Sequence, residues 1–437
     1  MTTPSPYFHT DSHGWAELLP KRTPTPPLTG EHRYKWAVIG AGLTGISCAR
    51  RLAQLHPNDE ILLVEAREVA QGASGRNSGF TVSTSHFSGG YDKSQKHNYA
   101  RTNRINQAGV DILRAQTTEH AIDCQWDESG FHHTAADNAA LRECEHFKHY
   151  LTDMDIAHTP LAAQALEDRL GTTLYKAGVF VPSGVLVQPA ALVRGLADTL
   201  PANVALAEQT PALKIDVGAP HILHLKNGSV KVGTLFLAVN YEAGKLGFLR
   251  RRLIGSTLSG SFTRILTHEE LASLGSLKQW GALSLHGGGA TVRLTYDGRI
   301  CLRNTAEYHG GALLSGKLQA KRQTVHRASF EKRFPQLAHV PFEYAWSGVE
   351  GISRNGTNFF GRQHDNLYLA GGFNGSGVSR GTAFGTALAD YACGGQSALI
   401  NDCLASAPAS YLPPRPVLDI GAYFTVRSRF KGVGLDR

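Results

Sequence analysis

Three glycines with the spacing Gly40-x-Gly42-x-x-Gly45 are the first residues whose types and spacing predict chemistry. Gly40 allows a tight turn, Gly42 lets the backbone approach a pyrophosphate, and Gly45 lets a helix pack closely on a strand. The N-terminus of that helix offers N–H groups and the positive end of its dipole to the phosphates. Glu65 stands 20 residues beyond Gly45, where a carboxylate accepts hydrogen bonds from ribose hydroxyls. The pattern predicts a dinucleotide site, and the acid disfavours the 2′-phosphate of NADP.

NAD and FAD share this fingerprint, so two further glycine-rich segments decide between them. Residues 72–79 are small and rich in donors, which suits a loop that contacts phosphate and a planar ring through backbone N–H groups. Residues 368–378 combine a strand, a glycine-rich turn and a helix start, which would place N–H groups against the anionic edge of a reduced flavin. We therefore expect FAD. The expected cofactor contacts in these segments are Gly40, Gly42, Leu43, Thr44, Gly45, Glu65, Ala66, Ser74, Gly75, Arg76, Asn77, Ser78, Gly372, Phe373, Asn374, Gly375, Gly377 and Val378.

The elements that must position these loops follow from the periodicity of the apolar residues. Residues 36–39 and 61–64 are short apolar runs typical of strands buried on both faces, and a helical pattern lies between them. Asn227-Gly228 and Asp297-Gly298 predict hairpin turns. Further helices are expected over 98–115, 138–154, 189–200 and 381–391, and further strands over 179–181, 204–206, 221–225, 234–239, 291–296, 299–304 and 367–370. The nucleotide-binding unit should therefore form from separated stretches of the chain.

Composition bounds the class of protein. The 437 residues are 42% hydrophobic and 18% charged, which is typical of a globular chain of two or three domains. The formal net charge of +8 leaves an anionic partner open without requiring one, because like charges form no long run. The six cysteines lack metal-ligand spacing, so we expect reduced, buried thiols and no metal. No apolar stretch is long enough to span a membrane, and the proline-rich residues 1–30 predict an extended arm instead of a signal peptide.

Taken together, these motifs resemble those of the D-amino-acid-oxidase-type superfamily of FAD-dependent amine oxidoreductases. Within it, the chain is most similar to the gamma-glutamylputrescine oxidoreductase group, whose relatives include cyclic imino-acid oxidases. The resemblance runs from about residue 35 to the C-terminus. Besides the glycine-rich segments, it depends on Arg293-Leu294-Thr295, Phe334-Pro335-Gln336-Leu337 and Trp346-Ser347-Gly348.

The resemblance implies an α/β plus α+β architecture, in which a discontinuous Rossmann-like FAD-binding domain meets a substrate domain built on an antiparallel sheet that roofs the flavin. It also implies that Thr210 contacts adenine through its backbone. The expected boundaries are 1–30 for the N-terminal arm, 31–120, 183–245 and 345–437 for the FAD-binding domain, and 121–182 and 246–344 for the substrate domain.

Two places in the sequence concern how the FAD is held. Val239 stands where the family usually has a glycine, and Asn240 follows it, which argues against close backbone approach to FAD at that point. Neither His86 nor Cys301 stands where covalent relatives carry their linking residue, so we expect non-covalent FAD.

The activity implied by the resemblance is oxidation of a C–N bond, in which a hydride passes from the carbon beside nitrogen to flavin N5 and the imine then hydrolyses. Relatives similar to glycine oxidase carry an arginine after W-x-G-L to hold a substrate carboxylate, whereas Trp346-Ser347-Gly348-Val349 precedes Glu350 here. An acid attracts an ammonium group, which favours a gamma-glutamylputrescine-like amine with a cationic or neutral second end. The expected substrate contacts are Arg293, Tyr296, Glu350 and Arg354, while His132-His133 is expected in a solvated turn.

Other functions stay open from the sequence. They are a cyclic imino-acid oxidase of the L-pipecolate or proline type, another amino-acid oxidase, a tRNA-modification oxidase, and an FAD-binding protein without turnover. A tRNA-modification oxidase would suit the basic net charge, but the sequence lacks a cluster of basic and aromatic residues. No nucleic acid is therefore expected as a partner. The expected partners are a small amine or amino acid and O2 or another electron acceptor, with a cytoplasmic location. The oligomeric state is open.

Overall fold

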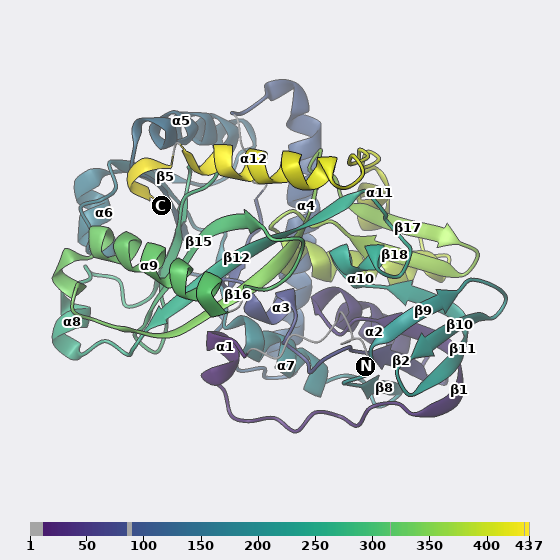
Figure 1. Cartoon of the computed structure of the whole chain (residues 1–437). Helices are drawn as coiled ribbons and strands as arrows, with labels where there is room; N and C mark the ends of the chain where they lie inside the picture. Colours follow the sequence, from purple (N-terminus) through teal and green to yellow (C-terminus); the bar gives the residue numbers. More distant parts are fainter. Residues whose placement is uncertain (1–11, 85–89, 315, 432, 437) are drawn as a thin grey trace.

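Two eight-stranded sheets organise the computed structural model, which describes residues 12–84, 90–314, 316–431 and 433–436 (Figure 1). The first sheet has the order β17-β18-β11-β1-β2-β8, and β9 and β10 extend it beside β11. Its parallel strands are β1 (Gly30–Ile39), β2 (Ile61–Val64), β8 (Val204–Ala207), β11 (Gly228–Leu237) and β18 (Leu367–Gly371). This order is the doubly wound arrangement of a Rossmann-like domain, as the sequence predicted.

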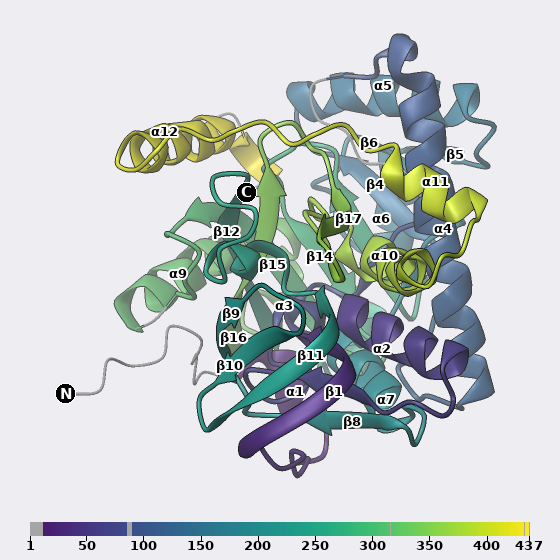
Figure 2. The same ribbon diagram turned by 90° about the vertical axis from the view of Figure 1, so that its right-hand side faces the viewer.

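The two faces of the first sheet are covered differently because successive side chains of a strand point to opposite faces. Trp36 and Val38 of β1 pack against helices, whereas Ala37 and Ile39 pack toward the antiparallel hairpin β9–β10 (Figure 2). Antiparallel β17 (Phe359–His364) forms one edge. The helical layer consists of α2 (Leu43–Leu55), α4 (Lys96–Glu119), α7 (Pro189–Asp198), α10 (Gly377–Ala392) and α11 (Ala398–Leu404). The hairpin on the opposite side consists of β9 (Ala212–Asp216) and β10 (His221–Leu225). The predicted turn between β10 and β11 lies one residue earlier than expected, at Lys226-Asn227, because Gly228 already pairs with Leu225 as the first residue of β11.

The second sheet has the order β16-β12-β15-β14-β13-β4-β6-β5, and all its pairings are antiparallel except that of β13 with β4. Helices α6 (Ala163–Leu170) and α9 (Gly316–Arg333) pack on one face of this sheet. Helix α5 (Asn138–Asp153) packs on the other face, against β4 and β6, and this is the face that is turned toward the first domain. The strands are β4 (Phe131–Ala135), β5 (Thr159–Ala162), β6 (Ala177–Val181), β12 (Leu253–Thr263), β13 (Trp280–Ser284), β14 (Thr291–Leu294), β15 (Ile300–Tyr308) and β16 (Phe342–Ser353). Short elements between the sheets are α3 (Ala73–Arg76), β3 (Phe80–Thr81), β7 (Val185–Leu186) and α8 (His268–Ala272).

The C-terminal part of the chain is divided between the two sheets differently from expectation. The expected boundary at residue 345 falls inside β16, which pairs with β12 of the second sheet along its whole length. The last helix, α12 (Val417–Lys431), packs on β15 instead of on the nucleotide-binding side (Figure 1). A strand's own sequence does not specify its sheet partner, so this assignment depends on the tertiary structure.

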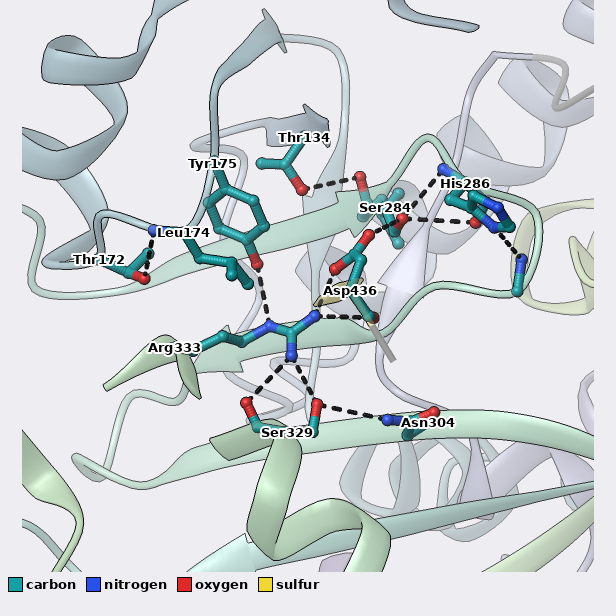
Figure 3. A network of polar contacts seen from close by, with 12 residues as sticks. Thr134, Thr172, Leu174, Tyr175, Ser284, His286, Asn304, Ser329, Arg333 and Asp436 are labelled. Carbon is teal, nitrogen blue, oxygen red and sulfur yellow. Dashed lines mark hydrogen bonds and ion pairs between the residues drawn. The ribbon is translucent and has the colours of Figure 1, made fainter. Parts of the chain in front are cut away.

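The chain end is held by a buried ion pair in the second domain, drawn in Figure 3. Arg333 of α9 and Asp436 are both fully buried and pair through the guanidinium and the carboxylate. Arg333 also donates to Ser329, and the Asp436 carboxylate accepts from the Ser284 hydroxyl. The last described residues therefore support the end of β13, one wall of the cavity described below.

The N-terminal segment is only partly the extended arm that was expected. Residues 14–17 form the short helix α1 (Gly14–Glu17), and Trp15 is 1% exposed. Its ring stacks edge-on against Phe262 of β12 at a centroid distance of 4.6 Å. The proline-rich residues that follow do run without regular structure toward β1. The buried side chain of Trp15 therefore anchors the segment. The high proline content of residues 1–30 gave no indication of this anchor.

The remaining global expectations concern cysteines, metals and membranes. All six cysteines are free thiols, and five are buried, but Cys393 is exposed, contrary to expectation. In the described ranges, His, Cys, Asp and Glu side chains form no group of three that could hold a metal ion. None of the helices in those ranges has the length and apolar character needed to cross a membrane.

Candidate cofactor and substrate site

A cavity of about 1160 Å³ lies between the two sheets. Pockets for single small molecules usually occupy roughly 300–1,000 Å³, so this one has room for a dinucleotide and a substrate beside it. All three glycine-rich segments reach it. The expected contacts that line it are Gly40, Gly42, Leu43, Thr44, Glu65, Ala66, Ser74, Arg76, Asn77, Ser78, Thr210, Phe373, Asn374, Gly375, Gly377 and Val378.

Helix α2 begins at the cavity with unsatisfied donors. Its N-cap, Gly42, offers no side-chain acceptor to the first turn. The Leu43 N–H donates to Ser74 Oγ at 3.1 Å, whereas the N–H groups of Gly42 and Thr44 have no acceptor within the described part of the chain. Unmet N–H groups at the positive end of a helix dipole bind anions. The residues present therefore fit the pyrophosphate of FAD.

Two of the expected contact glycines serve packing instead. A Cβ on Gly45 would stand 1.7 Å from the carbonyl oxygen of Gly40, so only glycine lets α2 approach the preceding turn. A Cβ on Gly75 would stand 2.0 Å from the carbonyl oxygen of Ala70. Neither residue lines the cavity. The helix-packing role that the motif predicts for Gly45 agrees with this geometry, but direct cofactor contact does not.

Glu65 and Thr210 meet at the expected adenosine end. The Glu65 carboxylate accepts from the N–H groups of Ala41 at 2.9 Å and Arg67 at 3.1 Å, which fixes it at the end of β2. Each oxygen keeps a further lone pair for a ribose hydroxyl. The Thr210 N–H donates to the Glu65 carbonyl at 2.8 Å, so the only backbone group of Thr210 left for adenine is its own carbonyl.

Side chains of residues 72–79 shape their own loop. Arg76 donates to the carbonyl oxygens of Gln71 at 2.9 Å and Ser347 at 3.0 Å, which ties the loop to β16. The Asn77 side chain accepts from the Gly79 N–H and donates to the Ser74 carbonyl at 2.6 Å. Contact with the cofactor is thus left mainly to the backbone, as the composition of the loop predicts.

The second glycine-rich turn leads into α10, which also begins at the cavity without a side-chain cap. The N–H groups of Gly377 and Val378 have no protein acceptor among the described residues, so they fit the anionic edge of a flavin. Gly372 is different from expectation. It adopts a φ of +72°, lies outside the cavity lining, and donates its N–H to Asn240 Oδ1 at 2.8 Å. Asn240 thus fixes the turn from the position after Val239.

The four expected substrate contacts separate into two pairs. Glu350 and Arg354 line the cavity, whereas Arg293 and Tyr296 do not. Tyr296 is 75% exposed, because β14 ends at Leu294 and the strand alternation assumed for residue 296 stops there. Arg293 is fully buried and donates to the Val187 carbonyl at 2.7 Å, and burial lowers its pKa to about 10. Both residues are therefore corrected from substrate contacts to surface and interior positions.

Glu350 lies on β16 and is the carboxylate of the cavity that faces α10. A Cβ on Gly375 would lie 3.7 Å from its Oε2 atom. No hydrogen bond or ion pair within 4 Å involves this carboxylate in the described chain, so it does not pair with Arg354, the other charged residue expected here. Burial raises the pKa of Glu350, and the nearby Arg303 acts in the opposite direction.

Arg303 is a charged cavity residue that the sequence did not single out. It lies on β15, two residues beyond Cys301, and both line the cavity. Burial lowers the pKa of Arg303, while Glu350 acts to raise it. The alternation of the predicted strand 299–304 could have indicated Arg303 once Cys301 was placed toward the cofactor. His133, expected in a solvated turn, is instead buried in β4 and also lines the cavity.

The expectation of non-covalent FAD concerns His86 and Cys301. His86 lies outside the described residues. Burial raises the pKa of the Cys301 thiol to about 12, so it stays protonated and weakly nucleophilic at neutral pH. The mode of FAD attachment stays a prediction.

Comparisons with known proteins agree with this geometry. A family model described as DAO, FAD dependent oxidoreductase, matches residues 35–391. Gamma-glutamylputrescine oxidoreductase of Escherichia coli (strain K12) is 25% identical over 440 residues, which cover 96% of this chain and 99% of that protein. Glycine oxidase from Geobacillus kaustophilus has a TM-score of 0.69 at 18% identity, covering 84% of this chain and 96% of that chain. L-proline dehydrogenase from P. horikoshii has a TM-score of 0.66 at 16% identity, covering 86% of this chain and 96% of that chain.

Proposed function

Since the chain belongs to the DAO family of FAD-dependent oxidoreductases, which makes it a flavoprotein acting on amines or amino acids, we propose that it oxidises a C–N bond in a gamma-glutamylputrescine-like amine. Bound FAD supplies the hydride acceptor for the carbon beside nitrogen, and the protein orients the substrate and excludes water. The observation that carries the proposal is the Glu350 carboxylate in the cavity wall, which has no hydrogen-bond or ion-pair partner among the described residues.

Glu350 suits an ammonium group for electrostatic reasons. A carboxylate in a partly desolvated cavity gains more from a cationic ligand than it would in water. Gly375 and the start of α10 lie beside it, in the segment that fits the flavin edge. An amine held at Glu350 would thus be close to the redox centre.

Arg303 supports a substrate with a second charged group. It lies two strands away from Glu350 in the second sheet, because β12 pairs with both β15 and β16. The two side chains influence each other's pKa without forming an ion pair within 4 Å. A gamma-glutamyl amine carries both an ammonium and a carboxylate and can satisfy both residues. Arg303 therefore favours a substrate whose second end is anionic, whereas the sequence favoured a neutral or cationic second end.

The same arginine favours one alternative, a cyclic imino acid, whose nitrogen and carboxylate could use the same two residues. Anaerobic bleaching of the flavin should separate these substrates. The panel is gamma-glutamylputrescine, putrescine, L-pipecolate, L-proline, sarcosine and a set of D-amino acids. We expect gamma-glutamylputrescine to reduce the flavin fastest. Faster reduction by L-pipecolate or L-proline would establish the alternative instead.

Replacement of Glu350 tests the residue itself. Glu350→Gln should raise KM for the amine by roughly 5- to 150-fold, because a charge-assisted contact of about 1–3 kcal/mol is lost. Since the pKa of Glu350 is raised, KM of the unmodified protein should also rise as the pH falls toward that pKa, and this dependence should vanish in the variant. Glu343→Gln, on the same strand but outside the cavity lining, is the matched control.

Thermal unfolding distinguishes a binding group from a structural one. A raised folded-state pKa means that ionised Glu350 destabilises the folded protein above that pKa, and that this penalty disappears below the ordinary range for glutamate. Glu350→Gln should therefore raise Tm at neutral pH and leave it unchanged in acid. A lower Tm of Glu350→Gln, together with an equal loss of activity toward every substrate, would show that Glu350 only supports the loop. That result would refute its role in binding.

A further inference from the structure

Exposed apolar side chains are concentrated on α12 and the segment that leads into it. Val417 is 58% exposed, Ile420 57% and Phe424 62%, and Tyr423 and Tyr411 are also exposed. Elsewhere in the described chain, large exposed apolar residues occur singly or in pairs. Scattered exposed apolar residues are ordinary, but a continuous group marks an interaction surface.

Helix α12 differs from an ordinary surface helix because it exposes large apolar side chains on its outer face as well as packing apolar side chains inward. Val417, Ile420 and Phe424 share one face at helical spacing, and that face points to solvent. The less exposed residues of the helix, which are Leu418, Asp419, Ala422 and Val426, share the opposite face, and α12 packs on β15. The helix is nevertheless held firmly, because Tyr308 donates to Asp419 at 2.5 Å. Packing within the chain thus does not account for the large outward side chains.

The charges of this segment are predominantly basic. Residues 411–437 contain five arginines and lysines against two aspartates. Asp419 is paired with Arg415 at 3.3 Å, and Asp436 is buried against Arg333, so neither acid faces the surroundings as a free charge. Arg427 follows Phe424 by one turn and is exposed. The outward face therefore begins apolar and ends basic.

We propose that α12 docks the protein on the surface of an anionic membrane. Aromatic and aliphatic side chains exposed on a surface helix, with a basic residue beside them, insert into the lipid interface, where anionic headgroups attract the charge. Charge complementarity favours lipid over a second copy of this chain, whose same segment is equally basic. The inference does not depend on which amine is oxidised.

The position of α12 relative to the cavity gives the docking a consequence. Ala405, Ser406 and Ala407, which precede α12 in the chain, line the cavity. The linking segment is fixed to the body by the Leu412 N–H, which donates to the Arg251 carbonyl at 2.7 Å. Figures 1 and 2 show α12 along one outer edge of the molecule, with this segment running from it to α11. Docking would thus bring this rim of the cavity near the lipid, from which an apolar electron acceptor could be reached.

Vesicle co-sedimentation of the FAD-loaded protein tests the proposal. The vesicles contain phosphatidylcholine alone or with phosphatidylglycerol. We expect binding to the anionic vesicles that weakens with salt, at least tenfold weaker binding for the double variant Ile420→Ser with Phe424→Ser, and about fivefold weaker binding for Arg427→Gln. Ile265→Ser with Tyr296→Ser is the matched control, because these apolar residues are equally exposed but lie near α8.

The outcomes are decisive because the altered side chains are exposed, so Tm and flavin retention should be unchanged in every variant. Absence of binding to anionic vesicles would overturn the proposal, and so would equal binding to both vesicle types. An equal loss of vesicle binding in the control variant, Ile265→Ser with Tyr296→Ser, would overturn it as well. A concentration-dependent dimer that the α12 double variant abolishes, without vesicle binding, would assign this face to contact between copies.

Discussion

At the residue scale, the cavity contains charged groups that are fixed by the backbone and others that are left free for a ligand. Glu65 belongs to the first kind, since two backbone N–H groups hold its carboxylate. Glu350 belongs to the second, because no described residue forms a hydrogen bond or ion pair with its carboxylate. Arg303 is intermediate, because it donates to Thr291 Oγ1 at 2.5 Å but forms no ion pair within 4 Å. Fixed groups suit the cofactor, which every turnover reuses, whereas free groups suit a substrate that enters and leaves.

Glu65→Ala should weaken FAD binding by tenfold or more. Two hydrogen bonds from ribose hydroxyls to a charged acceptor contribute about 1.5–3 kcal/mol each. Titration of the apoprotein with FAD measures the change in Kd, and Glu60→Ala, an exposed acid at the other end of the same strand, is the control. An unchanged Kd for Glu65→Ala would mean that the carboxylate serves only Ala41 and Arg67.

At the element scale, the N-terminal arm reinforces the loop that ends at Thr210. Arg22 donates to both oxygens of Glu208, at 2.7 and 2.6 Å, and Glu208 is fully buried. Two residues further on, Thr210 accepts from the Leu28 N–H at 3.0 Å. Burial alone would raise the pKa of Glu208, but hydrogen bonds from Arg22, Val69 and Thr25 bring it below the usual value.

Arg22→Met should therefore reduce stability by about 1–3 kcal/mol at neutral pH, because a buried carboxylate loses its charged partner but keeps its backbone donors. The carboxylate contributes stability above the ordinary glutamate range and loses it as the pH falls through its lowered pKa, so the difference should vanish in acid. Urea unfolding at several pH values measures it, with the exposed Lys21→Met as control. A loss that does not depend on pH would contradict the ion-pair explanation.

At the scale of the whole molecule, Trp15 connects the two domains. Its ring packs on Phe262 and Trp346 of the second sheet, and its carbonyl accepts from Gln188, the N-cap of α7 in the first domain, at 2.7 Å. Arg293 lies 5.1 Å from the same ring, in the range of a cation–π contact. One side chain thus fills the junction above which the cavity forms.

Trp15→Ala should destabilise the protein by about 3–5 kcal/mol, the usual cost of removing a large buried aromatic side chain. The lost contact with Trp346 should also disturb the strand that carries Glu350, so KM should rise in parallel. Trp15→Phe should retain most of the stability and should leave KM close to that of the unmodified protein. Urea unfolding monitored by flavin fluorescence, together with steady-state kinetics, provides the comparison; full stability of Trp15→Ala would exclude the connecting role.

What the sequence determined by itself is local. The Gly40–Gly45 turn, the strand at 61–64, the hairpin turns and the helix after the second glycine-rich segment each depend on backbone conformations and hydrogen bonds within a few residues, so composition and spacing could specify them. The start of that helix was less well specified, because α10 begins at Gly377 instead of the expected residue 381. Glu65 and Glu350 could be singled out for the same reason, as acids at fixed distances from recognisable motifs. The tertiary structure alone decided that β16 joins the second sheet, that Arg303 and Glu350 line the same cavity, that Arg293 turns inward and that Trp15 fills the junction. Those placements depend on which distant strands pair and which faces become buried, and such pairings are selected by packing across the whole molecule.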